Sequence, residues 1–438
     1  MQRRNGYSDL NDQFESLKSS QYLRPDEIKA IQLNKLKKLL KYSYANIPFY
    51  HDRFKKAGFN PTDFKTLEDL KIIPLLTKDD IRKNSSQLIN NEDKNKDNYI
   101  VTLSGGTTGP SIEIYNSKQT IAAKIASQHR FDSWAGWTKG DWSSIIWPAV
   151  VDFSKKPPSF KSKIRNYLSD RMLLLQQSVI NEDQFQEHFS DVLIKKPSVV
   201  RGFPTQLYLA AKYAIENGLK FPFISGVIST GEVLLPEQRL LIQQAFECPV
   251  YNSYRTREVG CIAQECSEQN GFHVNSEQLY VEIVWDRPNL EDGVGKIVVT
   301  DLENTTMPFI RYEIGDLGRL TESSCECGRG LPLLENIGGR ISDQLYSTTG
   351  KQISPVTVLP NMFHLLGINN QFRIIQEQFN VITIMMVKPE LNTNKLNEQK
   401  RAARIIFGDD VVLNYQYVDK IEPVSSGKFP IVISKIEH

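Results

Sequence analysis

A run of small and hydroxyl-bearing residues, Ser104-Gly105-Gly106-Thr107-Thr108-Gly109-Pro110, directly follows the apolar segment Tyr99 to Leu103. A glycine-rich turn after a strand lets backbone N–H groups close on phosphate oxygens, and Ser and Thr hydroxyls add further donors. The run is not the common nucleotide-binding P-loop, because Pro110 and Ser111 stand where that motif has Lys and Ser/Thr. It is therefore either a plain turn or a phosphate-binding loop whose cation comes from elsewhere in the chain.

Length and composition set the broad class. A chain of 438 residues is longer than a single hydrophobic core usually supports, which predicts a large domain and a second, smaller domain. The net charge of +2 gives no overall electrostatic case for a nucleic-acid partner. No apolar run is long enough to span a bilayer, and five cysteines do not make a disulfide framework in so long a chain. We expect a cytoplasmic protein; no pattern indicates its oligomeric state.

The first part of the chain, residues 1–98, is expected to be helical. Pro25 opens a segment in which Ile28, Ile31, Leu36, Leu39 and Leu40 recur at roughly helical spacing. The sequence Thr77-Lys78-Asp79-Asp80 resembles a capping box with Asp in place of the usual Glu.

From residue 100 to about 335, strand-like and helical patterns alternate. Short strands are expected at 199–202, 226–230 and 249–254, with helices at 204–217 and 236–246 between them. Residues 280–285 and 296–300 are expected to form an antiparallel pair.

A second, smaller domain is expected after Gly338-Gly339, where the composition changes. It should contain a strand over Phe379 to Val387, and residues Arg401 to Phe407 are expected to form part of a helix. The predicted fold is α/β: a large domain (1–338) with mixed sheets and helices, and a small α+β domain (339–438).

Several further motifs follow the glycine-rich run in a fixed order. They are Ser229-Thr230-Gly231-Glu232, Tyr254-Arg255-Thr256-Arg257-Glu258, Arg311-Tyr312-Glu313-Ile314-Gly315-Asp316, Gly339-Arg340-Ile341-Ser342-Asp343 and the turn Pro423 to Phe429, which presents Lys428. This set resembles the adenylate-forming enzymes, and within them the phenylacetate-CoA ligase branch and its CapK-like relatives. The segments Asn46 to Tyr50 and Leu75 to Asp79 add to the likeness, which covers essentially the whole chain. It implies that the large domain binds AMP and that the small domain is mobile.

The resemblance implies a role for each motif. Ser104, Gly105, Gly106, Thr107, Thr108 and Gly109 would hold the ATP β- and γ-phosphates; Ser229, Thr230, Gly231, Glu232 and Tyr254 would line the adenine. Glu258 would hold Mg²⁺, Asp316 would accept the ribose hydroxyls, and Arg340 would contact ribose or phosphate. Lys428 would reach the substrate carboxylate and the α-phosphate, and Asp343 would be the hinge of the small domain.

The chain departs from the family at two positions. Arg255 stands where a small residue is usual, and Arg257 replaces Ser or Thr. The two arginines either contact phosphate or an anionic acyl substrate, or pair with acidic neighbours on the surface. We count Arg255 among the cofactor-binding candidates.

Three cysteines and a histidine make a possible zinc site. The ligand set of a closed tetrahedral site is present in Cys266, His273, Cys325 and Cys327, although the spacing alone favours unrelated buried thiols and a surface histidine. The resemblance favours zinc, because this family branch often carries a structural zinc on such residues.

A stretch of aromatic and basic residues also has two interpretations. In one interpretation the aromatic residues form the rim of an acyl pocket, and the basic residues bind the phosphates of CoA or an anionic carrier. In the other, the aromatic residues belong to the core and the basic residues form a solvated face. The aromatic residues are Trp137, Trp142, Trp147 and Phe153, and the basic residues are Lys155, Lys156, Lys161, Lys163 and Arg165.

The expected function is that of an ATP- and Mg²⁺-dependent ligase that adenylates a small carboxylic acid and transfers the acyl group. Coenzyme A is the first expectation for the acceptor. An amino sugar or other amine in surface-polysaccharide biosynthesis is the alternative, and Arg255 and Arg257 leave open a nucleotide- or acyl-binding protein without turnover.

Overall fold

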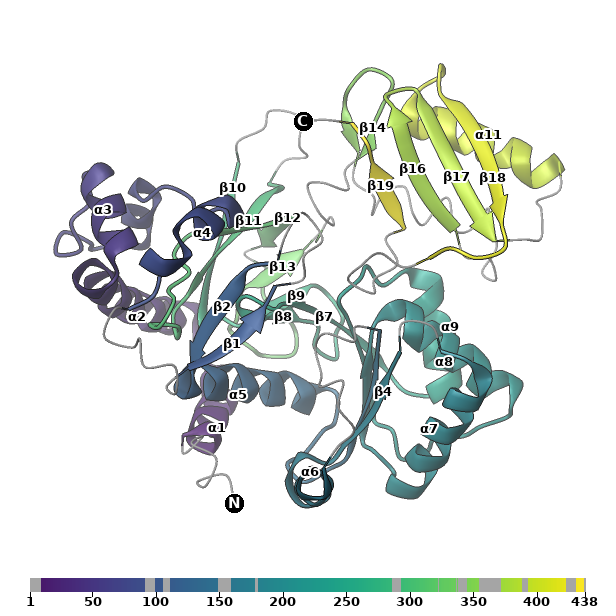
Figure 1. Ribbon diagram of the computed structural model, residues 1–438, viewed down its shortest axis with the longest axis horizontal. Coiled ribbons are helices and arrows are strands. Elements are labelled where there is room, and N and C mark those ends of the chain that lie inside the picture. The colour runs from purple at the N-terminus through teal and green to yellow at the C-terminus, as the bar shows by residue number, and fades with distance from the viewer. Residues whose placement is uncertain are drawn as a thin grey trace.

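An eleven-stranded sheet runs through the larger part of the molecule, and a separate four-stranded sheet lies at its C-terminal end (Figure 1). The computed structural model describes residues 9–90, 99–104, 111–148, 159–177, 180–285, 293–321, 323–335, 337, 345–353, 372–387, 393–422 and 431–436. Within this described part, no helix is both long and apolar enough to cross a bilayer.

The N-terminal segment is helical, as its pattern predicted. Its helices are α1 (Leu10–Ser20), α2 (Pro25–Asn46), α3 (Pro48–Lys56) and α4 (Lys78–Asn84). Helix α2 buries Leu36, Leu39 and Leu40. The capping box of α4 is confirmed, because the Thr77 hydroxyl accepts from the Asp80 N–H and the Asp80 carboxylate accepts from the Thr77 N–H.

One half of the large sheet is parallel. Its strands are β3 (Ser143–Trp147), β4 (Met172–Gln176), β5 (Val199–Gly202), β6 (Gly226–Thr230) and β7 (Val250–Thr256). Helices α7 (Glu182–Lys195), α8 (Pro204–Glu216) and α9 (Pro236–Phe246) cover one face and share an apolar core with it. Helix α5 (Lys118–Trp134) contacts the sheet at β8. The connections through helices explain the parallel order.

The other half is antiparallel and packs against the N-terminal helices. It contains β8 (Gly260–Gln264), β9 (Phe272–Val274), β10 (Leu279–Val284), β11 (Gly295–Asp301), β12 (Tyr312–Thr321) and β13 (Leu333–Glu335). The predicted antiparallel pair is confirmed as β10 with β11. Across the sheet the order is β10-β11-β12-β13-β9-β8-β7-β6-β5-β3-β4. A hairpin of β1 (Tyr99–Leu103) and β2 (Glu113–Ser117) flanks the glycine-rich segment.

The C-terminal part has its own sheet and core. Its elements are β14 (Leu345–Tyr346), β15 (Gln352–Ile353), β16 (Phe372–Gln378), β17 (Val381–Val387), α11 (Thr393–Phe407), β18 (Val412–Val418) and β19 (Val432–Ser434). The core includes Ile374, Ile384 and Phe407, and Leu235 from the beginning of α9 joins it. The two parts of the molecule therefore touch at α9.

The α/β fold class is confirmed, with one correction at the C-terminal end: the strand expected from Phe379 begins at Val381. Residues 401–407 do form part of a helix, α11, which begins at Thr393. Residues 393–400 are polar, so they carried little of the apolar periodicity on which the helix assignment rested. The boundary at 338/339 lies outside the described residues and stays a prediction.

Candidate functional site

The glycine-rich run is flanked by a closed hairpin. Ser104 follows β1 directly and is buried, and its N–H donates to the Ile112 carbonyl at 2.9 Å. The Ile112 N–H donates in return to the Ser104 hydroxyl oxygen, also at 2.9 Å. The hairpin therefore holds together Ser104 and Ile112, which stand on either side of the glycine-rich residues. Gly105, Gly106, Thr107, Thr108 and Gly109 lie outside the described residues.

The segment Ser229 to Glu232 lies at the C-terminal end of β6, where open α/β sheets place their ligands. Thr230 is buried and its hydroxyl donates to the Ser253 carbonyl of β7 at 2.7 Å. Gly231 has a φ of +86°, and a Cβ there would lie 2.3 Å from the Phe203 ring, so only glycine fits this turn. Glu232 accepts a hydrogen bond from the Thr205 hydroxyl at 2.7 Å.

Tyr254 and Asp316 meet although their strands are not neighbours. The Tyr254 hydroxyl donates to Asp316 Oδ2 at 2.6 Å. Tyr254 is on β7 and Asp316 is on β12, and three other strands separate β7 from β12 in the sheet. The two residues assigned by the resemblance to adenine and ribose are thus in direct contact.

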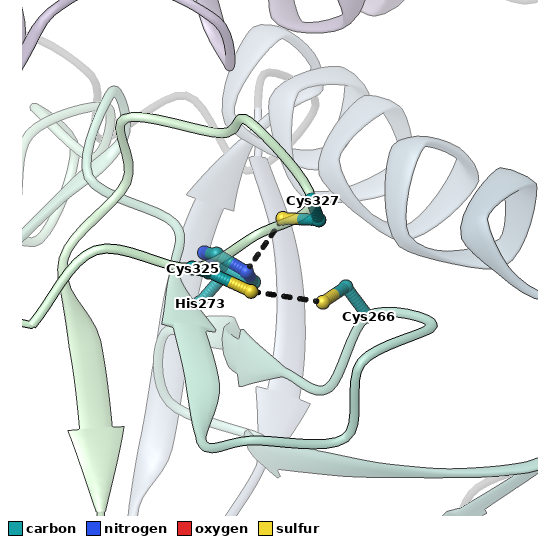
Figure 2. Close-up of side chains that lie close together, drawn as sticks. All are labelled: Cys266, His273, Cys325 and Cys327. Carbon is teal, nitrogen blue, oxygen red and sulfur yellow. Dashed lines mark hydrogen bonds between the residues drawn. The ribbon is translucent and has the colours of Figure 1, made fainter.

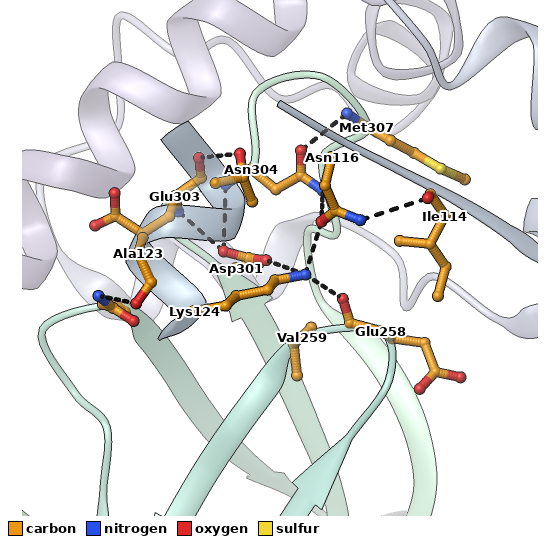
Figure 3. A network of polar contacts seen from close by, with 12 residues as sticks. Ile114, Asn116, Ala123, Lys124, Glu258, Val259, Asp301, Glu303, Asn304 and Met307 are labelled. Carbon is orange, nitrogen blue, oxygen red and sulfur yellow. Dashed lines mark hydrogen bonds and ion pairs between the residues drawn. The ribbon is translucent and has the colours of Figure 1, made fainter. Parts of the chain in front are cut away.

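Glu258 lies in the short turn between β7 and β8, four positions after Tyr254. It is buried, and its Oε1 lies 3.5 Å from the Tyr312 hydroxyl. In Figure 3 its carboxylate points away from Lys124, whose contact is with the main-chain carbonyl. A buried carboxylate is a suitable oxygen ligand for a divalent cation.

Lys124, a residue that the sequence analysis missed, connects this turn to the hairpin. Its Nζ donates to the Glu258 carbonyl and to Asn116 Oδ1, each at 2.8 Å, and lies 3.9 Å from Asp301 Oδ2 (Figure 3). Burial lowers the pKa of Lys124, although the nearby acidic groups oppose this, and burial raises the pKa of Asp301. A lysine among the buried Ala122, Ala123 and Ala126 of α5 was the available sequence signal.

Arg255 points into the protein interior. It lies 3.6 Å from Asp132 Oδ1, and it donates to Ser253 Oγ at 2.6 Å and to Gln264 Oε1 at 3.1 Å. Asp132 also pairs with the buried Arg201 of β5. Of the interpretations left open for Arg255, the structure shows pairing with an acidic neighbour, and that neighbour is buried. Arg257 is half-buried.

The four predicted zinc ligands come together (Figure 2). Their ligand atoms all lie within 4.8 Å of one another, with 3.6 Å between the sulfurs of Cys266 and Cys325 and 3.2 Å between the Cys327 sulfur and His273 Nε2. Tetrahedral zinc requires about 3.8 Å between two sulfurs and about 3.6 Å between sulfur and nitrogen. The four residues thus fit a closed zinc site far better than the alternative of unrelated thiols.

The surroundings of this cluster also fit a metal. His273 Nδ1 lies 3.3 Å from the Leu331 carbonyl, which orients Nε2 toward the sulfurs. Burial lowers the pKa of His273 to about 4, so the imidazole is neutral as a metal ligand must be. Burial raises the pKa of Cys266 to about 12. A dication would offset that cost and hold the thiolate form.

Three further predicted residues lie outside the described part of the chain: Arg340, Asp343 and Lys428. His188, a residue to which the sequence analysis gave no role, has its Nε2 2.8 Å from Ser144 Oγ. Both residues are buried between β3 and α7, so the pair is an interior hydrogen bond.

Comparison with known proteins agrees with these observations. The CapK C-terminal domain family matches residues 345–435. Protein CapK of Staphylococcus aureus is 24% identical over 93% of this chain and 89% of its own, and the phenylacetate-coenzyme A ligase of Thermus thermophilus is 23% identical over 88% and 86%.

Solved structures share the fold. A 2-hydroxyisobutyryl-CoA ligase in its postadenylation state matches with a TM-score of 0.76 at 20% identity, over 95% of this chain and 91% of that one. The same ligase in its thioesterification state gives a TM-score of 0.62 at 21% identity, over 95% and 91%. The chain is therefore similar along most of its length to Protein CapK and to the phenylacetate-coenzyme A ligases, and it shares the fold of the 2-hydroxyisobutyryl-CoA ligase.

Proposed function

We propose that this protein uses ATP and Mg²⁺ to convert a carboxylic acid to an acyl-adenylate and then transfers the acyl group to an acceptor. The observation that carries the proposal is the 2.6 Å contact between the Tyr254 hydroxyl and Asp316. Tyr254 stands four positions before Glu258 in the sequence. Residues that the resemblance assigns to adenine and ribose thereby touch, and the carboxylate assigned to Mg²⁺ lies 3.5 Å from the hydroxyl of Tyr312, on the same strand as Asp316. Two of these assignments depend on segments far apart in the sequence, so their meeting supports the site as a whole.

In the proposed adenylation step, the protein positions charge. Ser104 to Gly109 would hold the β- and γ-phosphates, and Tyr254 with Ser229 to Glu232 would bind the adenine. The Asp316 carboxylate has two acceptor oxygens, which suits the two ribose hydroxyls. Mg²⁺ would supply charge neutralisation of the phosphates, and Glu258 would hold it. The Lys124 contact fixes the main chain at Glu258, so its carboxylate needs little reorganisation.

The small domain would complete the site with Lys428 and turn about Asp343 for the second step. A cation near the reacting carboxylate and α-phosphate removes much of the repulsion between the two anions. The higher TM-score with a postadenylation structure than with a thioesterification structure supports an arrangement of the two parts close to the former. We also propose that Arg340 contacts the nucleotide.

Coenzyme A is the proposed acceptor, because the relatives include phenylacetate-coenzyme A ligases. An amine, such as an amino sugar in surface-polysaccharide assembly, is the alternative, which the match to Protein CapK and the CapK C-terminal domain favours. A third possibility is a binding protein without turnover. The contacts of Arg255 with Asp132, Ser253 and Gln264 weaken it, because they engage the guanidinium that would otherwise interfere with phosphate binding.

Zinc would have a structural role in this enzyme. With four protein ligands the metal keeps no position for water or substrate. Cys266 and His273 follow the Glu258 turn, whereas Cys325 and Cys327 precede β13, so the metal would join the two segments. The free state of all five cysteines fits the proposed cytoplasmic location.

Pyrophosphate release tests the proposal. Purified protein with ATP, Mg²⁺ and a panel of carboxylic acids should release pyrophosphate with at least one acid. Lys428→Ala and Glu258→Gln should each lower that rate on the order of 100-fold or more, whereas Glu313→Gln, which alters a peripheral ion pair with Lys296, should not. Release independent of every acid, or unchanged rates in both site variants, would contradict the assignment. Adding coenzyme A or amines afterwards identifies the acceptor.

A further inference from the structure

A helical segment on the surface presents apolar side chains to solvent along its whole length. It consists of α6 (Phe160–Arg165) and the π-helical turn that continues it, Asn166–Asp170. Phe160 is 78% exposed, Tyr167 59%, Leu168 51% and Ile164 44%. Figure 1 shows α6 at the lower edge of the molecule, on the side opposite the small sheet. The segment therefore contributes little to the core of the described structure.

The four apolar side chains form one stripe. Ile164 stands four positions after Phe160, three before Tyr167 and four before Leu168, which places all four side chains on one helix face. The segment is a defined unit, because the Ser159 hydroxyl caps its beginning at 3.2 Å from the Ser162 N–H and the Arg171 N–H closes its end on the Asn166 carbonyl at 2.7 Å.

Cations border this stripe. At about 100° per residue, Lys161 and Lys163 fall on opposite sides of it. At the end of α7, the Lys195 ammonium lies 4.9 Å from the centre of the Tyr167 ring and 5.3 Å from that of Trp142. The segment's acidic residue, Asp170, is paired with Arg165 at 3.0 Å. The border of the stripe is thus positively charged on a chain whose net charge is only +2.

We propose that this face, the α6 stripe with Lys161, Lys163 and Lys195, lies on an anionic lipid surface. An exposed apolar stripe between lysines is the arrangement of a helix that lies in the plane of a membrane interface, with its apolar side chains in the acyl boundary and its lysines at the headgroups. A free polyanion such as the phosphates of coenzyme A accounts for the lysines but leaves the apolar stripe without a role. A two-fold contact with a second copy would bring the lysines of both copies together, which charge repulsion opposes.

Sedimentation of the full-length protein with lipid vesicles tests this. Vesicles that contain phosphatidylglycerol should bind the protein at low salt, pure phosphatidylcholine vesicles should not, and high salt should weaken the binding. Phe160→Ser with Ile164→Ser should abolish binding. Lys161→Gln with Lys163→Gln should lower the partition coefficient about 25-fold, at about fivefold for each lysine. The matched control is Leu240→Ser with Ile405→Ser, since both residues are exposed apolar side chains on other helices, and it should bind like the unaltered protein.

Three outcomes would overturn the proposal. The first is equal binding to both kinds of vesicle, and the second is no binding to either. The third is that the unaltered protein forms a dimer and the Phe160/Ile164 variant is a monomer, which would assign the face to a second copy. Thermal melting of each variant shows that it is folded. Vesicle binding is independent of the proposed ligase activity, so either can fail without the other.

Discussion

Lys124 Nζ donates a hydrogen bond to the main-chain carbonyl of Glu258 at 2.8 Å, although 134 positions separate the two residues. The same ammonium reaches Asn116 on β2, so one largely buried cation joins the hairpin that flanks the glycine-rich run to the turn of the proposed Mg²⁺ ligand. Asp301 Oδ2, at 3.9 Å, supplies the countercharge. From this arrangement we expect Lys124 to be a positioning residue, which would act on the proposed reaction through Glu258.

Removing this cation should slow adenylation without preventing ATP binding. We expect Lys124→Met to lower the rate of acid-dependent ATP–pyrophosphate exchange on the order of 100-fold, because the Glu258 turn loses its fixed position. Lys118→Met, at the exposed start of the same helix, is the matched control and should keep its rate. Equal rates in the two variants would show that the contact has no part in catalysis.

A stability measurement separates this positioning role from folding. Lys124→Met leaves the buried Asp301 carboxylate unpaired and should lower the free energy of unfolding by about 3–5 kcal/mol. Adding Asp301→Asn removes that charge but keeps an oxygen for the Glu303 and Asn304 N–H groups, so stability should largely return. The double variant should still be slow in adenylation. If its rate recovers together with its stability, Lys124 has only a structural role.

The contact of Tyr254 with Asp316 predicts a small effect on nucleotide affinity. In Tyr254→Phe the aromatic ring remains for the adenine, but Asp316 loses one hydrogen-bond donor. We expect the KM for ATP to rise about 5- to 10-fold, equivalent to about 1 to 1.5 kcal/mol, with kcat nearly unchanged. A fall in kcat at constant KM would place the tyrosine hydroxyl in the chemical step instead.

Metal analysis should find one zinc ion per chain. Cys327→Ser should lose it and melt at a lower temperature than the unaltered protein, because the metal joins two segments of the folded chain. Cys248→Ser is the control, since that half-buried thiol lies outside the cluster and should leave the zinc content unchanged. A full complement of zinc in Cys327→Ser would mean that the ion is held elsewhere.

His188 predicts a loss of stability in mild acid. Burial lowers its pKa in the folded protein to about 4, against about 6.5 in the unfolded chain. Between these values the unfolded chain binds a proton that the folded protein does not, so stability falls as the pH drops from about 6.5 to 4, by up to about 3 kcal/mol. Urea unfolding of His188→Gln, which keeps a partner for Ser144, should show a weaker pH dependence in this window. Parallel curves for the two proteins would contradict the prediction.

Much of the fold was predictable because its signals are local. The helix with buried Leu36, Leu39 and Leu40, the capping box at Thr77 and the antiparallel pair β10–β11 follow from spacing along the chain. Only the C-terminal part of helix α11 was predicted, because its first half is polar and only its packing in the C-terminal core distinguishes it from a loop.

The sequence by itself determined the order of the elements, the motifs that resemble those of the adenylate-forming enzymes and the ligand chemistry of the cluster of three cysteines and a histidine. The tertiary structure alone decided which side chains meet: Tyr254 with Asp316 across three intervening strands, Lys124 with the Glu258 carbonyl, and Arg255 with Asp132 in the interior. Periodicity and capping are encoded within a few residues. Contacts between residues far apart depend on the order in which strands pair, and that order is set by the packing of the whole chain.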